Sequence, residues 1–496
     1  MTDSLAPPQP TAHGTPLLAN YIDGAWRAAD AQDTLEDRNP ATGEVVALVP
    51  LSGGADVDAA VGAARRALGA WRQTSPLKRA RALFALRDAL EAHRDELAAL
   101  VTRDMGKTLA DAHAEVGRGI ESVEAASAMP HLLKGESLAE VAQGLDVQMI
   151  RQPVGVVAAI TPFNFPAMIP LWFLPYAIGA GNTFVLKPSE QDPLTSQRLM
   201  ELIDAIEQIP PGVVNLVHGA HEAVDALLDH PGVDAISFVG SARTARYVHA
   251  RGAQQGKRVQ ALGGAKNSIV VMPDADRRLM VEGVLGSAFG AAGQRCLAGS
   301  VAVLVGTPAQ QDELRDAIVA GARRLRTGDG ADPGTDVCPV VTVAQRERLE
   351  LEIERAVREG AQILLDGRVG GGSAGAELAP TILHCAPEDS RVLREELFGP
   401  ILALTRVADL DAAIRWANRS PYGNAAMIFT ASGAAARRFR LDVEAGMVGV
   451  NVGVAAPIAW FPFAGWKASM EGDLHANGRD AIEFYTRRKV VTSRWG

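Results

Sequence analysis

Residues 154–186, VGVVAAITPFNFPAMIPLWFLPYAIGAGNTFVL, carry no formal charge, and the way this stretch folds decides the architecture. Its length exceeds the roughly 20 residues that a membrane-spanning helix needs. Prolines at positions 162, 166, 170 and 175 interrupt the stretch, and proline disrupts the interior of a helix. Strands that are buried in a parallel sheet are continuous apolar runs. The sequence therefore predicts a strand over 154–160, a helix around 167–179 and a second strand over 182–189, and no membrane span.

Helices and strands alternate along the chain that follows. The predicted order is helix 193–208, strand 212–219, helix 220–229, strand 234–241, helix 242–255 and strand 258–264. A second series then runs through strand 267–275, helix 276–292, strand 300–306, helix 308–325 and strand 361–367. Strands that alternate with helices in this way indicate a doubly wound parallel sheet. The two series therefore predict two doubly wound α/β domains.

The segments that flank these series complete the prediction. Residues 17–50 contain short strand-like pieces separated by the turn-prone NPATGE. Helices are predicted over 55–73, 76–105 and 107–134. In the second of them, apolar residues recur near a period of 3.6 residues: Leu83, Leu86, Leu90, Leu97 and Val101. Residues 146–153 and the tail 483–495 have strand propensity. We expect the tail to pair with another segment or with another subunit.

Composition limits the classes of function. A chain of 496 residues exceeds a single hydrophobic core, so two or three domains are expected. The formal net charge of −9 and the lack of a dense basic run argue against a nucleic-acid partner. The three cysteines (Cys296, Cys338 and Cys385) are too few and too scattered for a disulfide framework or a zinc cluster. The first 18 residues lack the charged and apolar regions of a signal peptide, so we expect a cytoplasmic protein. We predict that they form a flexible N-terminal segment.

Two motifs match known patterns without the context that would support them. GGGSAG at 370–375 fits both a dinucleotide-binding loop and a nucleophile elbow, but no helix opens after it. We predict a surface loop there. His218 and His221 are too few to bind zinc, which needs three or four ligands, so no metal site is predicted.

Candidate functional side chains instead lie near the ends of the predicted strands, where open α/β sheets meet their ligands. Each has an ordinary structural alternative: a turn residue, a surface charge, a helix cap or a solvated carboxylate. Cys296, in GAAGQRCLAG (290–299), is either a nucleophile or a buried, inert cysteine. The other candidates are Asn164 (TPFNFP), Lys187 and Glu190 (LKPSE), Gly240 and Ser241 (FVGSA), and Glu395 and Glu396 (EELFGP).

The order and spacing of TPFNFP, LKPSE, FVGS, GGAK, GQRC and EELFGP resemble those of the aldehyde dehydrogenase superfamily, from about residue 18 to 495. The resemblance implies two Rossmann-like α/β domains and a small β oligomerisation arm, in a homodimer or homotetramer. The NAD-binding domain would comprise 18–136 and 157–265, the catalytic domain 266–473, and the arm 137–156 and 474–496.

The same resemblance implies roles for the candidate residues. The Cys296 thiolate attacks the aldehyde, and the resulting thioester follows hydride transfer to NAD. Asn164 and the Cys296 backbone N–H bind the oxyanion. The residues that it implies for cofactor binding are Thr161, Phe163, Lys187, Glu190, Gln191, Gly240, Ser241 and Glu396.

One departure from the superfamily indicates the subclass. Hydrolytic members carry a glutamate about 34 residues before the cysteine, and here that position is Leu262 in QALGGAKN. A general base contributes roughly 10²–10⁴-fold, so water would attack the thioester slowly without one. A thiol needs less help, which favours transfer to coenzyme A.

Finer motifs resemble the CoA-acylating methylmalonate-semialdehyde dehydrogenase branch: NFPAMIPLWFLP, QALGGAKN, GQRC and the tail from FAGWKASMEGD onward. The implied substrates are methylmalonate and malonate semialdehyde, which lose CO₂ and leave as propionyl-CoA or acetyl-CoA. The implied ligands of the substrate carboxylate are Arg118 and Arg295, whose guanidinium groups can bind it bidentately. Residues 453–460 depart from the branch's pattern, which leaves the preferred acyl chain open. A hydrolysing dehydrogenase for another aldehyde is the nearest alternative, and a non-catalytic relative on this scaffold is a more distant one.

Overall fold

The uncharged stretch folds as a strand, a helix and a second strand, as predicted. The computed structural model describes residues 15–31, 33–368, 375–385 and 390–495. Strands β7 (Val156–Ile160) and β8 (Thr183–Lys187) pair in parallel, and helix α6 (Met168–Gly179) connects them. Every residue of α6 is buried, which explains why the helix has no polar face. Among the described residues, no helix is both long and apolar enough to cross a membrane.

The first sheet has eight strands in the order β2-β1-β9-β8-β7-β10-β11-β21. The five strands from β9 to β11 are parallel, whereas β1, β2 and β21 join antiparallel at the two edges. The remaining bounds are β1 (Asn20–Ile22), β2 (Ala25–Arg27), β9 (Val214–Leu216), β10 (Ala235–Val239), β11 (Arg258–Leu262) and β21 (Met470–Glu471).

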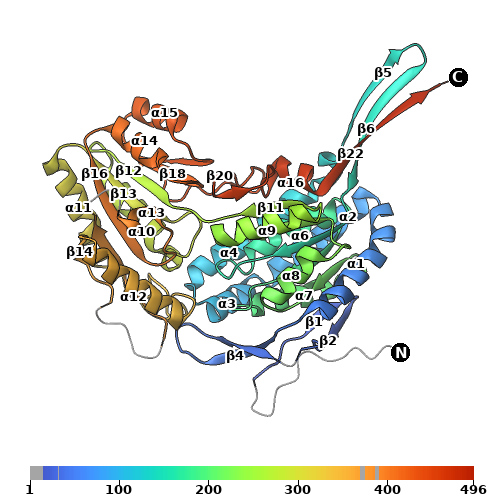
Figure 1. Ribbon diagram of the computed structural model, residues 1–496, viewed down its shortest axis with the longest axis horizontal. Coiled ribbons are helices and arrows are strands. Elements are labelled where there is room, and N and C mark those ends of the chain that lie inside the picture. The colour runs from blue at the N-terminus through green and yellow to red at the C-terminus, as the bar shows by residue number, and fades with distance from the viewer. Residues whose placement is uncertain (1–14, 32, 369–374, 386–389, 496) are drawn as a thin grey trace.

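Helices cover both faces of this sheet (Figure 1). One face packs against α1 (Gly54–Gln73), α8 (His221–Asp229) and α9 (Ala242–Gln254), and the other against α6 and α7 (Leu194–Asp204). Alternate strand residues supply the two cores: Val156 and Ala158 join the first, Val157 and Ala159 the second. A further layer lies outside α6: α2 (Pro76–Ala92), α3 (Arg94–Met105), α4 (Leu109–Ser127), α5 (Met129–Leu132) and α16 (Gly478–Tyr485).

Two helices that were predicted to be continuous are each divided. The segment 76–105 breaks at His93, where the backbone leaves helical geometry and the ring nitrogen contacts the Ala89 carbonyl (2.8 Å). The leucine period spans the break because both pieces bury their apolar residues in the same core. The segment 107–134 likewise forms α4 and the short α5.

The second sheet has seven strands in the order β14-β15-β16-β13-β12-β18-β19, all parallel except β14 at one edge. Helices α10 and α11 cover one face, and α14 covers the other with α15 outside it. The strands are β12 (Asn267–Val271), β13 (Gly299–Val305), β14 (Gln362–Leu365), β15 (Thr381–His384), β16 (Ile401–Val407), β18 (Ala425–Phe429) and β19 (Met447–Val450). The helices are α10 (Arg277–Phe289), η1 (Gly290–Gly293), α11 (Pro308–Ala322), α12 (Val343–Arg358), α13 (Arg391–Arg394), α14 (Leu410–Asn418) and α15 (Gly433–Asp442).

A three-stranded antiparallel ribbon projects from the body of the molecule (Figure 1). It consists of β5 (Glu136–Ala142), β6 (Leu145–Pro153) and the C-terminal β22 (Thr486–Arg494). The tail therefore pairs with β6 of its own chain, along the full length of both strands. Two small antiparallel pairs of strands complete the fold: the hairpin of β3 (Thr34–Arg38) with β4 (Val45–Pro50), and the pair of β17 (Tyr422–Gly423) with β20 (Trp466–Lys467).

The α/β fold class with two Rossmann-like sheets is confirmed. The exact domain limits stay predictions. Most of the 370–375 glycine motif lies outside the described residues, as does most of the N-terminal segment.

Candidate functional site

The carboxyl ends of β8, β7, β10 and β11 lie side by side, and the candidate cofactor residues follow them. Ile160 is in register with Lys187 and with Phe238, and Val239 is in register with Leu262. Thr161 continues the pairing, since its N–H donates to the Lys187 carbonyl (3.1 Å). Residues that are far apart in the sequence are thereby brought to one edge of the sheet.

Two of these residues form an ion pair at that edge. Lys187 is buried, and its Nζ lies 2.9 Å from Glu190 Oε2. Burial by itself would raise the pKa of Glu190, but the attraction and hydrogen bond of Lys187 outweigh it and hold the pKa below its ordinary value. A lysine and a carboxylate side by side can donate to and accept from a pair of hydroxyl groups. Gln191 is exposed, and its backbone N–H donates to Ser189 Oγ (3.0 Å).

Helix α9 begins at the same edge. Its N-cap is Ser241, whose Oγ accepts from the Thr244 N–H, and Gly240 precedes it at the end of β10. Ser241 is exposed, so the N-terminus of this 13-residue helix faces solvent. The first N–H groups of a helix suit an anionic phosphate.

Of the two adjacent glutamates, one turns inward and the other outward. Glu396 accepts from the Ala265 N–H (3.0 Å), and burial raises its pKa to about 7. Glu395 is exposed and pairs with Arg391 (2.6 Å). Phe163, the remaining candidate, stacks edge-on against Phe398, with ring centroids 5.7 Å apart.

The backbone around Cys296 is held by three asparagine side chains. Asn267 Nδ2 and Asn424 Nδ2 each donate to the Cys296 carbonyl at 2.8 Å, and Asn164 Nδ2 donates to the Gln294 carbonyl at 2.9 Å. Asn267 and Asn424 were not among the sequence candidates. Their bonds to the Cys296 carbonyl join segments that are far apart in the sequence, so the sequence pattern did not indicate them. Asn267 does lie in QALGGAKN, one of the motifs that carry the resemblance.

The surroundings of Cys296 disfavour the thiolate form of its side chain. Burial raises its pKa to about 12, the negative charge of Glu396 adds to the rise, and Arg295 and nearby backbone N–H groups oppose it. Glu396 therefore links the electrostatics of the candidate cofactor residues to those of the cysteine. Cys338 and Cys385 are buried, and burial likewise raises the pKa of each thiol to about 12.

A pocket of about 260 Å³ opens beside Cys296. Both candidate arginines line it, and each is already paired with a carboxylate. Arg295 Nη2 lies 2.7 Å from Asp111 Oδ1, and Arg118 pairs with Glu121 and also donates to the Pro457 carbonyl. The pocket is lined by Lys107, Asp111, Ala114, Glu115, Arg118, Ser122, Phe165, Met168, Trp172, Arg295, Cys296, Leu297, Val454, Ala456, Pro457, Ala459, Phe463 and Asn477.

An ion pair buried in the pocket wall holds the loop that carries Asn164. Lys107 Nζ lies 2.5 Å from Glu115 Oε2 and donates to the Asn164 carbonyl at 2.6 Å. Glu115 Oε1 accepts from the N–H groups of Ala167 and Met168. Sequence reasoning missed this pair. The spacing of Asp111, Glu115 and Arg118 by three or four residues places these three on one side of α4, whereas Lys107 lies just before the N-cap of that helix.

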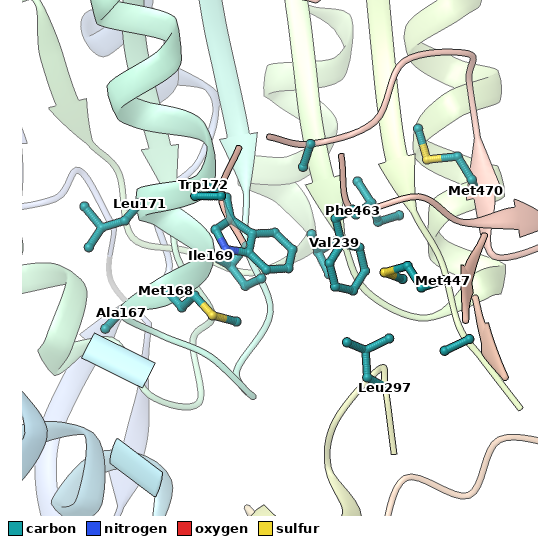
Figure 2. Close-up of a cluster of buried hydrophobic side chains, with 14 of the residues drawn as sticks. Ala167, Met168, Ile169, Leu171, Trp172, Val239, Leu297, Met447, Phe463 and Met470 are labelled. Atoms are coloured by element: carbon teal, nitrogen blue, oxygen red, sulfur yellow. The ribbon is translucent and has the colours of Figure 1, made fainter. Parts of the chain in front are cut away.

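Apolar side chains close the pocket on the side of α6 (Figure 2). Trp172 and Phe463 face each other with ring centroids 4.7 Å apart, and Met168 and Leu297 lie around them. The site therefore combines an apolar wall with a charged one.

Leu262, at the position of the missing glutamate, ends β11 and is buried. His218 is also buried, with Nε2 3.0 Å from Gln197 Oε1, and burial lowers its pKa to about 3. Within the described ranges, no group of three or more His, Cys, Asp and Glu side chains could hold a metal ion.

The chain is similar over nearly its whole length to proteins of one family. The sequence model of the aldehyde dehydrogenase family matches residues 26–491. Malonate-semialdehyde dehydrogenase 1 of Geobacillus kaustophilus is 49% identical over 483 residues, which cover 97% of this chain and 98% of that protein.

Solved structures of related dehydrogenases also match this chain over nearly its whole length. Methylmalonate-semialdehyde dehydrogenase from Oceanimonas doudoroffii matches with a TM-score of 0.94 at 44% identity, covering 97% of this chain and 98% of that one. A Sinorhizobium meliloti protein, assigned as a methylmalonate-semialdehyde dehydrogenase and solved in complex with NAD, matches with a TM-score of 0.95 at 41% identity and the same coverage.

Proposed function

The chain belongs to the aldehyde dehydrogenase family, and we propose that it is an NAD-dependent, CoA-acylating dehydrogenase of malonate or methylmalonate semialdehyde. The observation that carries the proposal is the pocket that Cys296 lines together with Arg118 and Arg295. The sequence adds Leu262 at the position where hydrolytic relatives carry a base. Relatives at 46–49% identity bear the name malonate-semialdehyde dehydrogenase, which supports the same substrate class.

The residues at the carboxyl edge of the first sheet fit a dinucleotide. Helix α9, which follows Gly240 and Ser241, offers the N–H groups of its exposed N-terminus to the phosphates, and the Lys187–Glu190 pair offers a donor and an acceptor for ribose hydroxyls. Thr161, Phe163, Gln191 and Glu396 would complete the contacts. NAD, when bound there, accepts the hydride that leaves the substrate carbon.

Cys296 is the proposed nucleophile. Its thiol must lose a proton before it attacks the aldehyde carbon, because the thiolate is the reactive form. The two groups that favour the thiolate are Arg295 and the backbone N–H groups of Cys296 and Leu297. Loss of the Glu396 charge from the neighbourhood, by protonation or by movement, would lower the thiol pKa further.

Asn164 is the proposed oxyanion donor, together with the Cys296 N–H. An amide group has two N–H donors. One of them is used on the Gln294 carbonyl, so the other is left for the oxygen of the substrate. A donor fixed in this way is worth more than a mobile one because it needs no reorganisation during the reaction.

Arg118 and Arg295 are the proposed ligands of the substrate carboxylate. A substrate carboxylate that binds Arg118 and Arg295 would interact with the same guanidinium groups that pair with Glu121 and Asp111. At the thioester stage, the bond between the carboxylate carbon and its neighbour breaks. CO₂ leaves, the electron pair passes to the thioester carbonyl as an enolate, and a proton from solvent completes the acetyl or propionyl group.

Transfer to coenzyme A completes the proposed reaction. The thiol of coenzyme A replaces Cys296 at the acyl carbon, and the Cys296 thiolate leaves. A hydrolysing dehydrogenase is the second candidate, because Glu396 is a carboxylate with a pKa of about 7 whose charge reaches Cys296. Such a group could activate water.

Partners and location follow from the same proposal. We place the protein in the cytoplasm as a homodimer or homotetramer. The ribbon of β5, β6 and β22 supports an assembly because it exposes Leu138, Val141, Val490 and Trp495.

The test is an assay with malonate semialdehyde and NAD, with and without coenzyme A, in which products are identified by mass. The proposal expects acetyl-CoA and a rate that depends on coenzyme A. Equal rates with and without coenzyme A, and accumulation of a free acid, would establish the hydrolysing alternative.

A further inference from the structure

Two carboxylates on helix α4 make the same pattern of bonds, each to one of the two arginines that line the pocket. Asp111 accepts from Arg295 Nη2 (2.7 Å) and from the Ala291 N–H (3.0 Å). Glu121 accepts from Arg118 and from the Ala459 N–H (2.8 Å). Each carboxylate therefore joins one pocket arginine to the backbone of one pocket loop.

The loop that Asp111 holds is the one that carries Cys296. Ala291 and Ala292 have φ angles of 49° and 52°, in the left-handed region. An L-residue other than glycine is strained in that region, so the surroundings must fix the conformation. Asp111 binds the first of these two alanines, and the chain reaches Cys296 five residues after it.

The direction of Arg295 is fixed on two sides. Asp111 binds one end of the guanidinium, and Gly290 packs against it so closely that a Cβ there would lie 2.5 Å from Nη2. Asp111 is thus the side chain that links the orientation of Arg295 to the turn before Cys296.

We propose that Asp111 is a positioning residue of this site, which sets both the place of Cys296 and the direction of Arg295. The role of Arg295 toward a substrate carboxylate rests on the function proposed above. Glu121 binds Arg118 and the Ala459 N–H in the same way, but these bonds hold a different loop from the one that carries Cys296. It is therefore a matched control, with the same chemistry on a loop that does not carry the nucleophile.

The first experiment measures the rate at which iodoacetamide alkylates Cys296 in the cofactor-free protein, with Cys296→Ser as the blank. Asp111→Ala releases the turn and frees Arg295 to favour the thiolate, so the rate should rise by at least about fivefold. Glu121→Ala should change the rate by less than about twofold, since the loop that Glu121 binds does not carry the cysteine. Equal rates in wild type, Asp111→Ala and Glu121→Ala would overturn the proposal.

The second experiment separates the two bonds of Asp111 through steady-state kinetics with propanal and malonate semialdehyde. Asp111→Ala should lower kcat for both aldehydes by roughly 10–10²-fold, because a displaced nucleophile misses the near-attack geometry. Asp111→Asn keeps an oxygen for the Ala291 N–H, so it should recover most of kcat for propanal while the preference for the carboxylated aldehyde stays reduced.

If Asp111→Ala does not fold, the Asp111→Asn variant still tests the proposal. An unchanged preference of Asp111→Asn for malonate semialdehyde over propanal overturns the role of Asp111 in orienting Arg295. The alkylation rates do not depend on the substrate. An alkylation contrast without turnover of malonate semialdehyde would therefore support Asp111 as a positioning residue and refute the proposed function.

Discussion

The buried ion pair between Lys107 and Glu115 gives a large and specific stability prediction. The Lys107 and Glu115 side chains are 1% and 0% exposed. Glu115→Gln removes the negative charge but keeps an oxygen that can accept from the N–H groups of Ala167 and Met168. The substitution therefore isolates one effect, a buried ammonium without a counter-ion. Breaking such a pair costs about 3–5 kcal/mol.

We expect the lower end of that range. Lys107 keeps its bond to the Asn164 carbonyl, and its Nζ lies 3.6 Å from the centroid of the Phe165 ring, an arrangement that favours the cation. A loss of about 3 kcal/mol lowers the midpoint of thermal unfolding by roughly 6–12 °C for a domain of about 150–250 residues. Circular dichroism against temperature measures that midpoint.

Two further variants make the result decisive. Glu124, on the same helix, has a side chain that is 44% exposed and lies 3.7 Å from Arg87, so Glu124→Gln should change stability by less than about 0.5 kcal/mol. Adding Lys107→Met to Glu115→Gln removes the isolated charge and should raise the midpoint above that of Glu115→Gln. A Glu115→Gln midpoint equal to that of Glu124→Gln, or a double variant below the single one, would refute the reasoning.

The remaining predictions concern the chemistry. Asn164→Ala should lower kcat by roughly 10²–10³-fold, with a smaller effect on KM, because it removes an oxyanion donor; an unchanged kcat contradicts that role. Since burial holds the pKa of the Cys296 thiol at about 12, its thiolate fraction should rise tenfold for each unit of pH, and alkylation should accelerate from pH 7 to 9 without a plateau. A plateau below pH 9 would contradict this pKa. Glu396→Gln should raise the alkylation rate at pH 8, because ionised Glu396 raises the thiol pKa, and a slower rate in the variant would contradict that effect. Arg118→Leu and Arg295→Leu should each reduce the preference for malonate semialdehyde over propanal, as ratios of kcat/KM show, and an unchanged ratio would remove that arginine from substrate recognition.

The first sheet was largely predictable because its signals are local: continuous apolar strands alternate with helices of a 3.6-residue period. Of the second sheet, only β12, β13 and β14 were predicted, and β14 pairs antiparallel with β15 although the predicted series was parallel. The breaks in the helices were not predictable, because the leucines on both sides of His93 bury themselves in one core and preserve the period. The antiparallel edge strand β21 was missed as well. It contributes only Met470–Glu471, too short for a pattern.

The site was predictable only in part. The candidate residues came from motifs and their order, and the structure brings Lys187, Thr161 and Gly240 to one edge and Cys296, Arg118 and Arg295 to one pocket. The carboxylates that hold those arginines were missed, since each pairing joins segments far apart in the chain. Asp111 and Arg295, for example, are 184 residues apart. A charged stripe on a helix is more often a solvated face than a pocket wall, so its spacing alone could not assign a role.

The proposed function requires that the acyl group on Cys296 reacts with the thiol of coenzyme A rather than with water. Intact-protein mass spectrometry tests it most directly: the protein is mixed with malonate semialdehyde and NAD, without coenzyme A, and sampled over time before coenzyme A is added. We expect an acetyl adduct on Cys296 that persists without coenzyme A and then disappears as acetyl-CoA forms. An adduct that decays equally fast without coenzyme A, or one that survives in the Cys296→Ser protein, would contradict it.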